Sequence, residues 1–192
     1  MANQHSGMTS LANQFLIAMP SLDDSYFGRS VTYICEHDDE GAMGLVVNKS
    51  TDMSVGRLLK EIKINDEVNP LLSDQLVLAG GPVQTDRGFV LHSGCREWSS
   101  SLHLNDNIMV TTSKDILENL ATETGPKEFV LTLGYAGWSA GQLEEELASN
   151  SWLTIDADPE LIFNTPIDQR WEKAVQMLGI DIAQLTAFAG HA

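Results

Sequence analysis

The chain has 192 residues, of which 43% are hydrophobic, with 15 glycines and 6 prolines; this composition is typical of a globular protein and excludes a disordered or fibrous one. Its length predicts a single domain over residues 1–192, because domains commonly hold ~100–200 residues. A net charge of −16 opposes contact with nucleic acid or an anionic membrane surface.

The N-terminal segment predicts a cytosolic location. Residues 1–10 lack the basic and apolar regions of a secretory signal. The longest early apolar stretch, Phe15 to Pro20, is far shorter than the roughly 20 residues that a membrane-spanning helix needs. We therefore expect a cytosolic protein without a membrane anchor, in which Cys35 and Cys95 remain reduced thiols.

Alternating apolar runs bounded by turn residues predict a series of β-strands. We expect them at residues 14–20, 29–37, 41–49, 75–81, 87–93 and 128–136, with a further hairpin over 102–112. Residues 38–41 predict a tight turn between the second and third strands. Strict alternation along the second strand would place Val31, Tyr33, Cys35 and His37 on one face, directed into the core.

Apolar residues at helical spacing predict helices between and after these strands. The stripes lie near residues 55–62, 116–120, 143–147, 171–178 and 182–188. We expect the second helix to continue to about Glu123, and Ser139 with Gln142 has capping-box spacing at the start of the third. The pattern favours an α+β fold: a small, mixed, mostly antiparallel, barrel-like sheet with flanking helices.

Residues 137–141 match the G-x-S-x-G pattern of a nucleophile elbow and lie between a predicted strand and a predicted helix. Asp156, Asp158 and His191 follow Ser139 in the order that a catalytic acid and base would take. However, His191 is the penultimate residue, and a capping role explains Ser139 without catalysis. A small hydrolase using Ser139 is therefore an alternative hypothesis.

Cys35-x-His37 and His92-x-x-Cys95 supply two thiols and two imidazoles, which is the ligand number of a tetrahedral zinc site. Their spacing and the core position of Cys35 instead favour structural roles, and we expect no metal or cofactor. Arg96 would favour the thiolate of Cys95, so a thiol enzyme using Cys35 or Cys95 is a second catalytic alternative.

Gly80-Gly81-Pro82 lacks the GK[ST] element of a P-loop and predicts a tight turn.

Several segments together resemble one known family. They are FLIAMP, SVTYICEH, GAMGLVVN, GGPVQTDRGFVLH, TTSKDIL, GYAGWSAGQLEEELASNSWL, LIFNTP and the closing GHA, and they resemble the AlgH/YqgE family of bacterial proteins over almost the entire chain. The resemblance implies a small mixed barrel with flanking helices in a cytosolic bacterial protein, and it implies no particular biochemical activity. One family member is named for a proposed role in regulating alginate production.

The resemblance bears on the catalytic alternatives at two places. The family pattern also accepts glycine where this chain has Ser139, and the Cys95 segment lies outside the family signature, so both positions weaken the catalytic alternatives. Asn48-Lys49-Ser50 replaces the commoner Asn-Arg-Pro. Transcriptional regulation through direct DNA contact is disfavoured, because the net charge is −16 and no helix-turn-helix pattern is present.

The leading hypothesis is a non-catalytic binding or regulatory module with an unidentified protein or small-molecule partner and no nucleic-acid partner. Its surface pocket is expected where the turns around residues 80–88, the strand end at His37 and the segment 134–142 meet, because loops joining rigid strands commonly carry binding residues. The candidate ligand-binding residues are His37, Arg87, His92, Trp138 and Gln142. The oligomeric state is left open.

Overall fold

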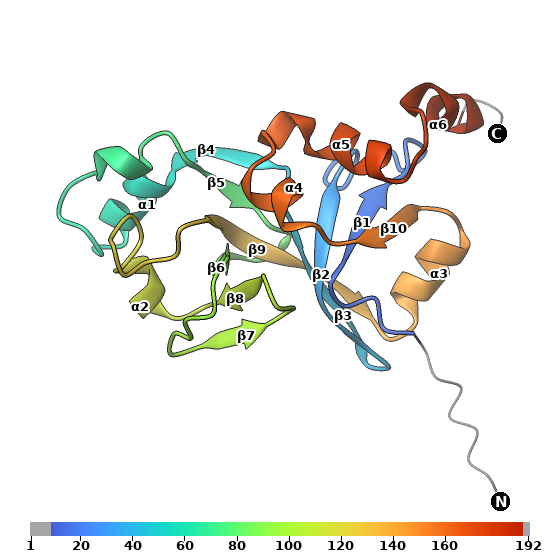
Figure 1. Ribbon diagram of the computed structural model, residues 1–192. Helices are drawn as coiled ribbons and strands as arrows, with labels where there is room; N and C mark the ends of the chain where they lie inside the picture. Colours follow the sequence, from blue (N-terminus) through green and yellow to red (C-terminus); the bar gives the residue numbers. More distant parts are fainter. Residues whose placement is uncertain (1–8, 190–192) are drawn as a thin grey trace, which may run out of the picture.

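The computed structural model describes residues 9–189, which form one curled sheet with short helices around it (Figure 1). Within that range the sheet has ten strands: β1 (Gln14–Ala18), β2 (Val31–Asp38), β3 (Gly41–Val46), β4 (Ser50–Ser54), β5 (Leu76–Ala79), β6 (Val83–His92), β7 (Ser101–His103), β8 (Met109–Thr111), β9 (Phe129–Ser139) and β10 (Trp152–Asp156). The helices are α1 (Val55–Glu61), α2 (Lys114–Leu117), α3 (Gln142–Ala148), α4 (Pro159–Phe163), α5 (Arg170–Met177) and α6 (Ile182–Ala189), with 3₁₀ turns η1 (Pro70–Leu72) and η2 (Ile167–Gln169).

The main strand order is β10-β1-β2-β3-β9-β6-β8-β7, and β4 pairs with β5 beside this path. β5 runs parallel to β9, and the other pairings are antiparallel. The sheet curls into a half-barrel, and it does not close because β10 and β7, at the ends of the main path, do not pair with each other (Figure 1). The predicted α+β, mixed, mostly antiparallel sheet is confirmed, and the curl stops short of closure.

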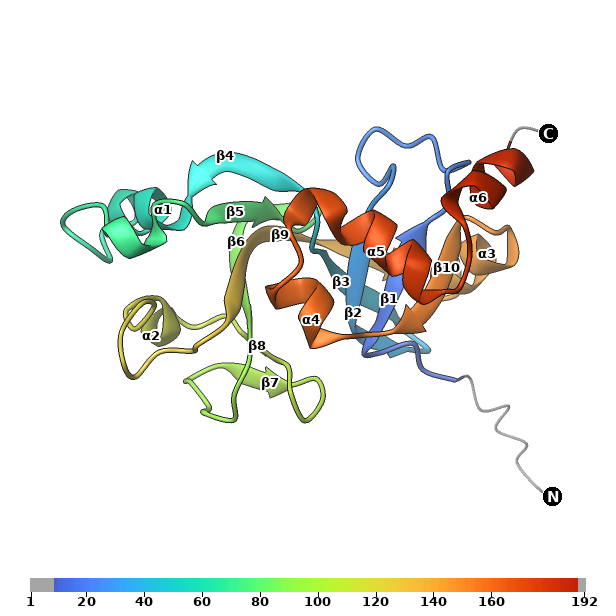
Figure 2. The ribbon, with the colours of Figure 1, turned by 45° about the horizontal axis from the view of Figure 1, so that its top comes forward.

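Strands β1 and β2 are buried on both faces. Phe15, Ile17 and Tyr33 pack in a cluster that includes Trp171 of α5. The alternate residues, which point to the other face and include Leu16, pack in a cluster with α3. α5 lies across one face of the sheet (Figures 1 and 2), and Trp171 Nε1 donates a hydrogen bond to the Ala18 carbonyl oxygen. A further cluster, with Val55, Leu59, Ile116 and Leu120, lies under α1 and α2.

A β-bulge interrupts the alternation of β2. Ile34 pairs with Gly44 and Glu36 pairs with Met43, so Cys35 is an extra residue in the ladder. The expectation that Cys35 and His37 share a face is therefore wrong. Cys35 packs with Tyr33 in the α5 cluster, whereas the side chain of His37 contacts α3.

Two predicted helix boundaries are also wrong. The second helix ends at Leu117 rather than near Glu123, because the chain turns over the next residues and Ala121 adopts φ of 59°. Ser139 does not cap the third helix, because β9 continues through it and Gly141, at φ of 77°, holds the N-cap position. Strands β4 and β10 and helix α4 are additional elements that the sequence patterns did not predict.

The Gly80-Gly81 pair lies against the middle of β9. Gly80 N–H donates to the Leu133 carbonyl, and the Gly80 carbonyl accepts from Val46 N–H, so this short segment bridges β9 and the end of β3. A Cβ atom on Gly81 would lie 1.9 Å from the Tyr135 carbonyl carbon, which no side-chain movement relieves. The sequence predicts only a tight turn at this segment. The structure shows that glycine is also required at position 81 because two backbones pack closely there.

We expect Gly81→Ala to destabilise the protein by roughly 3 kcal/mol or more, because the added methyl must displace the β9 backbone. Gly137→Ala is the matched control, since its Cβ would meet only the Tyr135 ring, at 3.6 Å. Urea unfolding followed by tryptophan fluorescence measures both variants. Equal free energies of unfolding for the two variants would contradict the requirement for glycine at position 81.

Candidate functional site

A recess with a volume of about 400 Å³ opens between the β2–β3 hairpin, β6, β9 and the β7–β8 hairpin. Its walls include the apolar side chains of Met43, Phe89, Val110 and Tyr135. The rings of Phe89 and Tyr135 meet edge to face, with centroids 5.9 Å apart. The recess therefore has an aromatic wall of the kind that small-molecule sites use.

Charged groups line the same recess. The Arg87 guanidinium lies over the Phe89 ring, 5.1 Å from its centroid, which is a cation–π arrangement. In the part of the chain that the structure describes, Arg87 forms no ion pair. The β2 bulge brings Glu36 into the recess beside the extra residue Cys35. The site thus offers an available cation and a carboxylate beside an apolar surface.

A third wall carries the hydroxyls of Ser100, Ser101 and Thr112. The Ser101 and Thr111 hydroxyls are 2.7 Å apart, and the Thr111 hydroxyl is 2.8 Å from His92 Nε2. His92 is buried, which lowers its pKa and keeps the ring neutral at pH 7. His92 therefore supports the hydroxyl wall from behind.

Asp115 holds Ser99 and Ser113, the residues next to Ser100 and Thr112 of this wall. Its carboxylate accepts hydrogen bonds from the Ser99 N–H and hydroxyl, both at 2.8 Å, and from the hydroxyl of Ser113. Desolvation raises the pKa of Asp115, but these hydrogen bonds outweigh it and lower the pKa to about 2. The carboxylate is thus charged at all but strongly acidic pH, and it ties α2 to the segment that forms the recess wall.

We expect Asp115→Asn to cost about 1 kcal/mol at pH 7, after allowing for solvent screening. The folded pKa lies below the unfolded value of about 3.9, so this stability is complete above that pH and is lost as pH falls toward 2. Unfolding by urea at several pH values measures the difference from wild type. Asp106→Asn, which removes a charge at an exposed turn, is the control, and identical profiles for both variants would contradict the role of Asp115.

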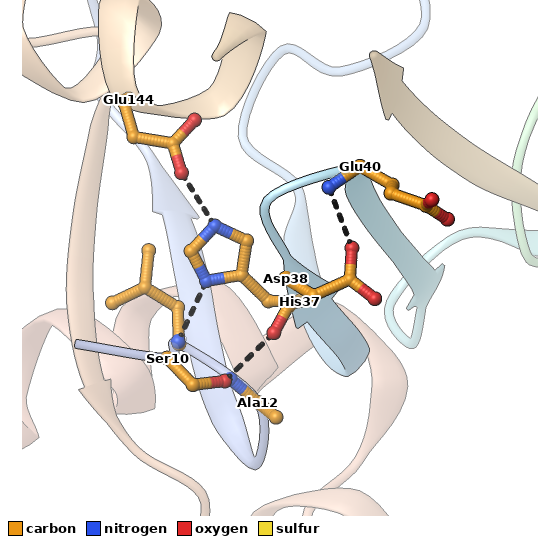
Figure 3. A network of polar contacts seen from close by, with 7 residues as sticks. Ser10, Ala12, His37, Asp38, Glu40 and Glu144 are labelled. Atoms are coloured by element: carbon orange, nitrogen blue, oxygen red, sulfur yellow. Dashed lines mark hydrogen bonds and ion pairs between the residues drawn. The ribbon is translucent and has the colours of Figure 1, made fainter. Parts of the chain in front are cut away.

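The predicted site residue His37 lies outside the recess, under α3 (Figure 3). Its Nδ1 accepts a hydrogen bond from Leu11 N–H at 2.8 Å, so Nε2 carries the proton and donates to Glu144 Oε1 at 2.6 Å. The Ser10 hydroxyl donates to the His37 carbonyl at 3.0 Å. His37 therefore joins the segment before β1 to α3.

Trp138, near the end of β9, and Gln142, the first residue of α3, both contact Glu146 of α3. Glu146 Oε2 accepts hydrogen bonds from the indole N–H groups of Trp138, at 3.0 Å, and Trp152, at 2.8 Å, and its other oxygen accepts from Gln142 Nε2 at 2.9 Å. The two indoles meet edge to face with centroids 6.2 Å apart. Among the predicted site residues, Arg87 lines the recess and His92 supports it, whereas His37, Trp138 and Gln142 gather around α3.

Ser139, Asp156 and Asp158 of the hydrolase alternative each have a hydrogen-bond partner outside such a triad. The Ser139 hydroxyl donates to Gln142 Oε1 at 3.2 Å, Asp156 accepts from Gln14, and Asp158 caps α4. His191 lies outside the described residues. The Cys35 thiol is buried, and desolvation raises its pKa far above neutrality, so it stays protonated.

The zinc alternative gains no support from the geometry. Cys35 and His37 point to opposite faces of β2, and His92 and Cys95 line a separate pocket at the end of β6. Within residues 9–189, no three His, Cys, Asp or Glu side chains gather as a metal site would require. The helices of the same range are all too short or too polar to cross a bilayer.

All three predicted segments contribute residues to the recess, whereas Arg87 alone of the five predicted side chains lines it. Cys35 and Glu36 come from the strand end before His37, Arg87 comes from residues 80–88, and Tyr135 comes from residues 134–142. The bulge left no signal in the sequence, because Ile34 and Cys35 are both apolar. The β7–β8 hairpin was predicted as structure, yet its serine and threonine hydroxyls gave no hint that they face the recess.

Comparison with known proteins places this architecture in one family. A family model described as AlgH-like matches residues 15–183. The chain belongs to the AlgH-like family. A UPF0301 protein of Pseudoalteromonas translucida is 57% identical over 96% of this chain and 100% of its own, and one of Vibrio cholerae is 55% identical over 95% and 99%.

Solved structures agree with this assignment. The solution structure of the AlgH protein from Pseudomonas aeruginosa superposes with a TM-score of 0.79 and 43% identity, covering 98% of this AlgH-like chain and 100% of that one. The crystal structure of protein DIP2367 from Corynebacterium diphtheriae has a TM-score of 0.69 at 19% identity, over 95% and 93% of the two chains, and shares the fold.

Proposed function

We propose that this AlgH-like protein is a non-catalytic binding module whose ligand occupies the recess around Arg87. The observation that carries the proposal is a guanidinium without an ion-pair partner in the described part of the chain, held over the aromatic wall of a recess of about 400 Å³. Ligand pockets of ~300–1,000 Å³ with few polar groups on apolar walls are typical of small-molecule sites.

The chemistry of the walls indicates the class of ligand. A flat apolar group fits against Phe89 and Tyr135, and an anionic or hydrogen-bond-accepting group fits Arg87. The hydroxyls of Ser100 and Thr112 add donors and acceptors on the facing wall, and their mutual contact at 3.1 Å sets their positions. A small amphipathic molecule with one polar end is therefore the proposed ligand.

The catalytic alternatives have less support. The thiol in the recess, Cys35, is held in its unreactive protonated form by burial. Ser139 lies on the α3 side with its hydroxyl engaged by Gln142 rather than by an imidazole of the described residues. Direct DNA binding is opposed by the net charge of −16.

We expect wild-type protein to be stabilised by a member of a panel of sugar acids, nucleotides and aromatic carboxylates, and Arg87→Gln to lose most of that effect. A ligand at 100 times its Kd adds about 2.7 kcal/mol, which for a domain of this size raises the Tm by roughly 5–10 °C. Differential scanning fluorimetry measures the shift, and calorimetry then gives the Kd.

Arg57→Gln is the matched control, because it removes the same charge from an exposed helix pair with Glu61. The two variants should have similar stability without ligand. A ligand that stabilises Arg87→Gln as strongly as Arg57→Gln does not use the recess, and a flat response over the whole panel would count against small-molecule binding.

A further inference from the structure

Arg170, the first residue of α5, is a buried cation away from the Arg87 recess. Only 5% of its surface is exposed. Its Nε donates to the Thr165 carbonyl at 2.9 Å, and Nη1 donates to the Val47 carbonyl at 2.6 Å. Within residues 9–189 no carboxylate lies within ion-pair distance of the guanidinium, and Nη2 has no hydrogen-bond partner. The charge is thus held in place but not neutralised.

Arg170 lines a groove with a volume of about 480 Å³, between the segment joining α4 to α5 and the strands β5 and β9. The groove has a long apolar surface formed by Leu78, Phe129, Val130, Phe163 and Ile167. Burial lowers the pKa of Arg170 to about 10, so the group is still charged at pH 7. An unpaired buried charge is costly, and a ligand anion that supplies its counter-charge would recover part of that cost.

The charges at the groove select among anions. Lys127 adds a second cation, whereas Asp74 and Glu128 add two carboxylates, and Glu128 is engaged by Asn164 Nδ2 at 3.1 Å. These acidic groups would repel a dianion or a polyphosphate more strongly than a monoanion. A guanidinium is suited to a planar carboxylate.

We propose that this groove is a second site, which binds a small amphipathic monocarboxylate with its acid group on Arg170 and its apolar chain along Phe129, Phe163 and Ile167. The site does not depend on the function assigned to the Arg87 recess. Hexanoate is a suitable probe, because it combines one carboxylate with a short apolar chain, and hexanamide has the same shape without the charge.

The Nε–H of Arg170 provides a direct readout, because its hydrogen bond to Thr165 protects it from exchange. Its resonance in a ¹⁵N–¹H spectrum is identified by its loss in Arg170→Lys. We expect hexanoate to shift this resonance saturably, with a Kd on the order of 1–10 mM, and hexanamide to leave it in place. Absence of a shift at concentrations well above this range would overturn the proposal, as would an equal shift with hexanamide.

Two variants test the charge preference without changing Arg170. Leu76 lines the groove and is 37% exposed, so its replacement should leave the fold intact. We expect Leu76→Glu to raise the Kd for hexanoate roughly five- to tenfold above that of Leu76→Gln, by repulsion between carboxylates. Equal Kd values for the two variants, or tighter binding of inorganic phosphate than of hexanoate, would contradict a monocarboxylate site.

Discussion

Backbone pairing along β9 joins the strands β10, β1, β2 and β3 to the strands β5, β6, β7 and β8. Its first half pairs with β6 and β5, its second half pairs with β3, and Gly134 between them adopts φ of 76° where the strand bends. The Gly80-Gly81 segment lies against Gly134, so two backbones approach closely where the pairing of β9 changes from β5 and β6 to β3. The Arg87 recess lies where these two groups of strands meet, because β2 and β3 supply one wall, β6 to β8 supply others, and β9 contributes Tyr135.

The two faces of the β1–β2 region serve different purposes. On one face, two partly exposed carboxylates of α3 accept hydrogen bonds from buried donors: Glu144 accepts from His37 Nε2, and Glu146 accepts from the indole N–H groups of Trp138 and Trp152. These carboxylates are the partners that such buried donors require. On the other face lie the apolar cluster under α5 and the recess at its edge. Polar residues that looked available for ligand binding in the sequence are thus occupied in holding α3.

The fold was largely predictable because its strong strands alternate regularly and are bounded by turn residues. β4 was missed because Ser50–Ser54 is polar, and its strand conformation depends on pairing with β5. β10 was missed because Trp152 and Leu153 pack on opposite faces, which removes the alternation that marks a half-exposed strand. For the site, Arg87 was predictable as a charged residue beside a strand. Among the described residues Arg170 has no carboxylate partner, and this arrangement depends on tertiary packing, which no local pattern encodes.

The bulge at Cys35 makes this point of the chain tolerant to a change in strand length. The ladder is already in register on both sides of Cys35, since Ile34 and Glu36 face consecutive residues of β3. A chain shorter by this one residue would keep Glu36 at the recess and the imidazole of His37 beneath α3. The recess would lose a thiol and gain space, so a natural length polymorphism here would alter its shape while leaving the surrounding architecture unchanged.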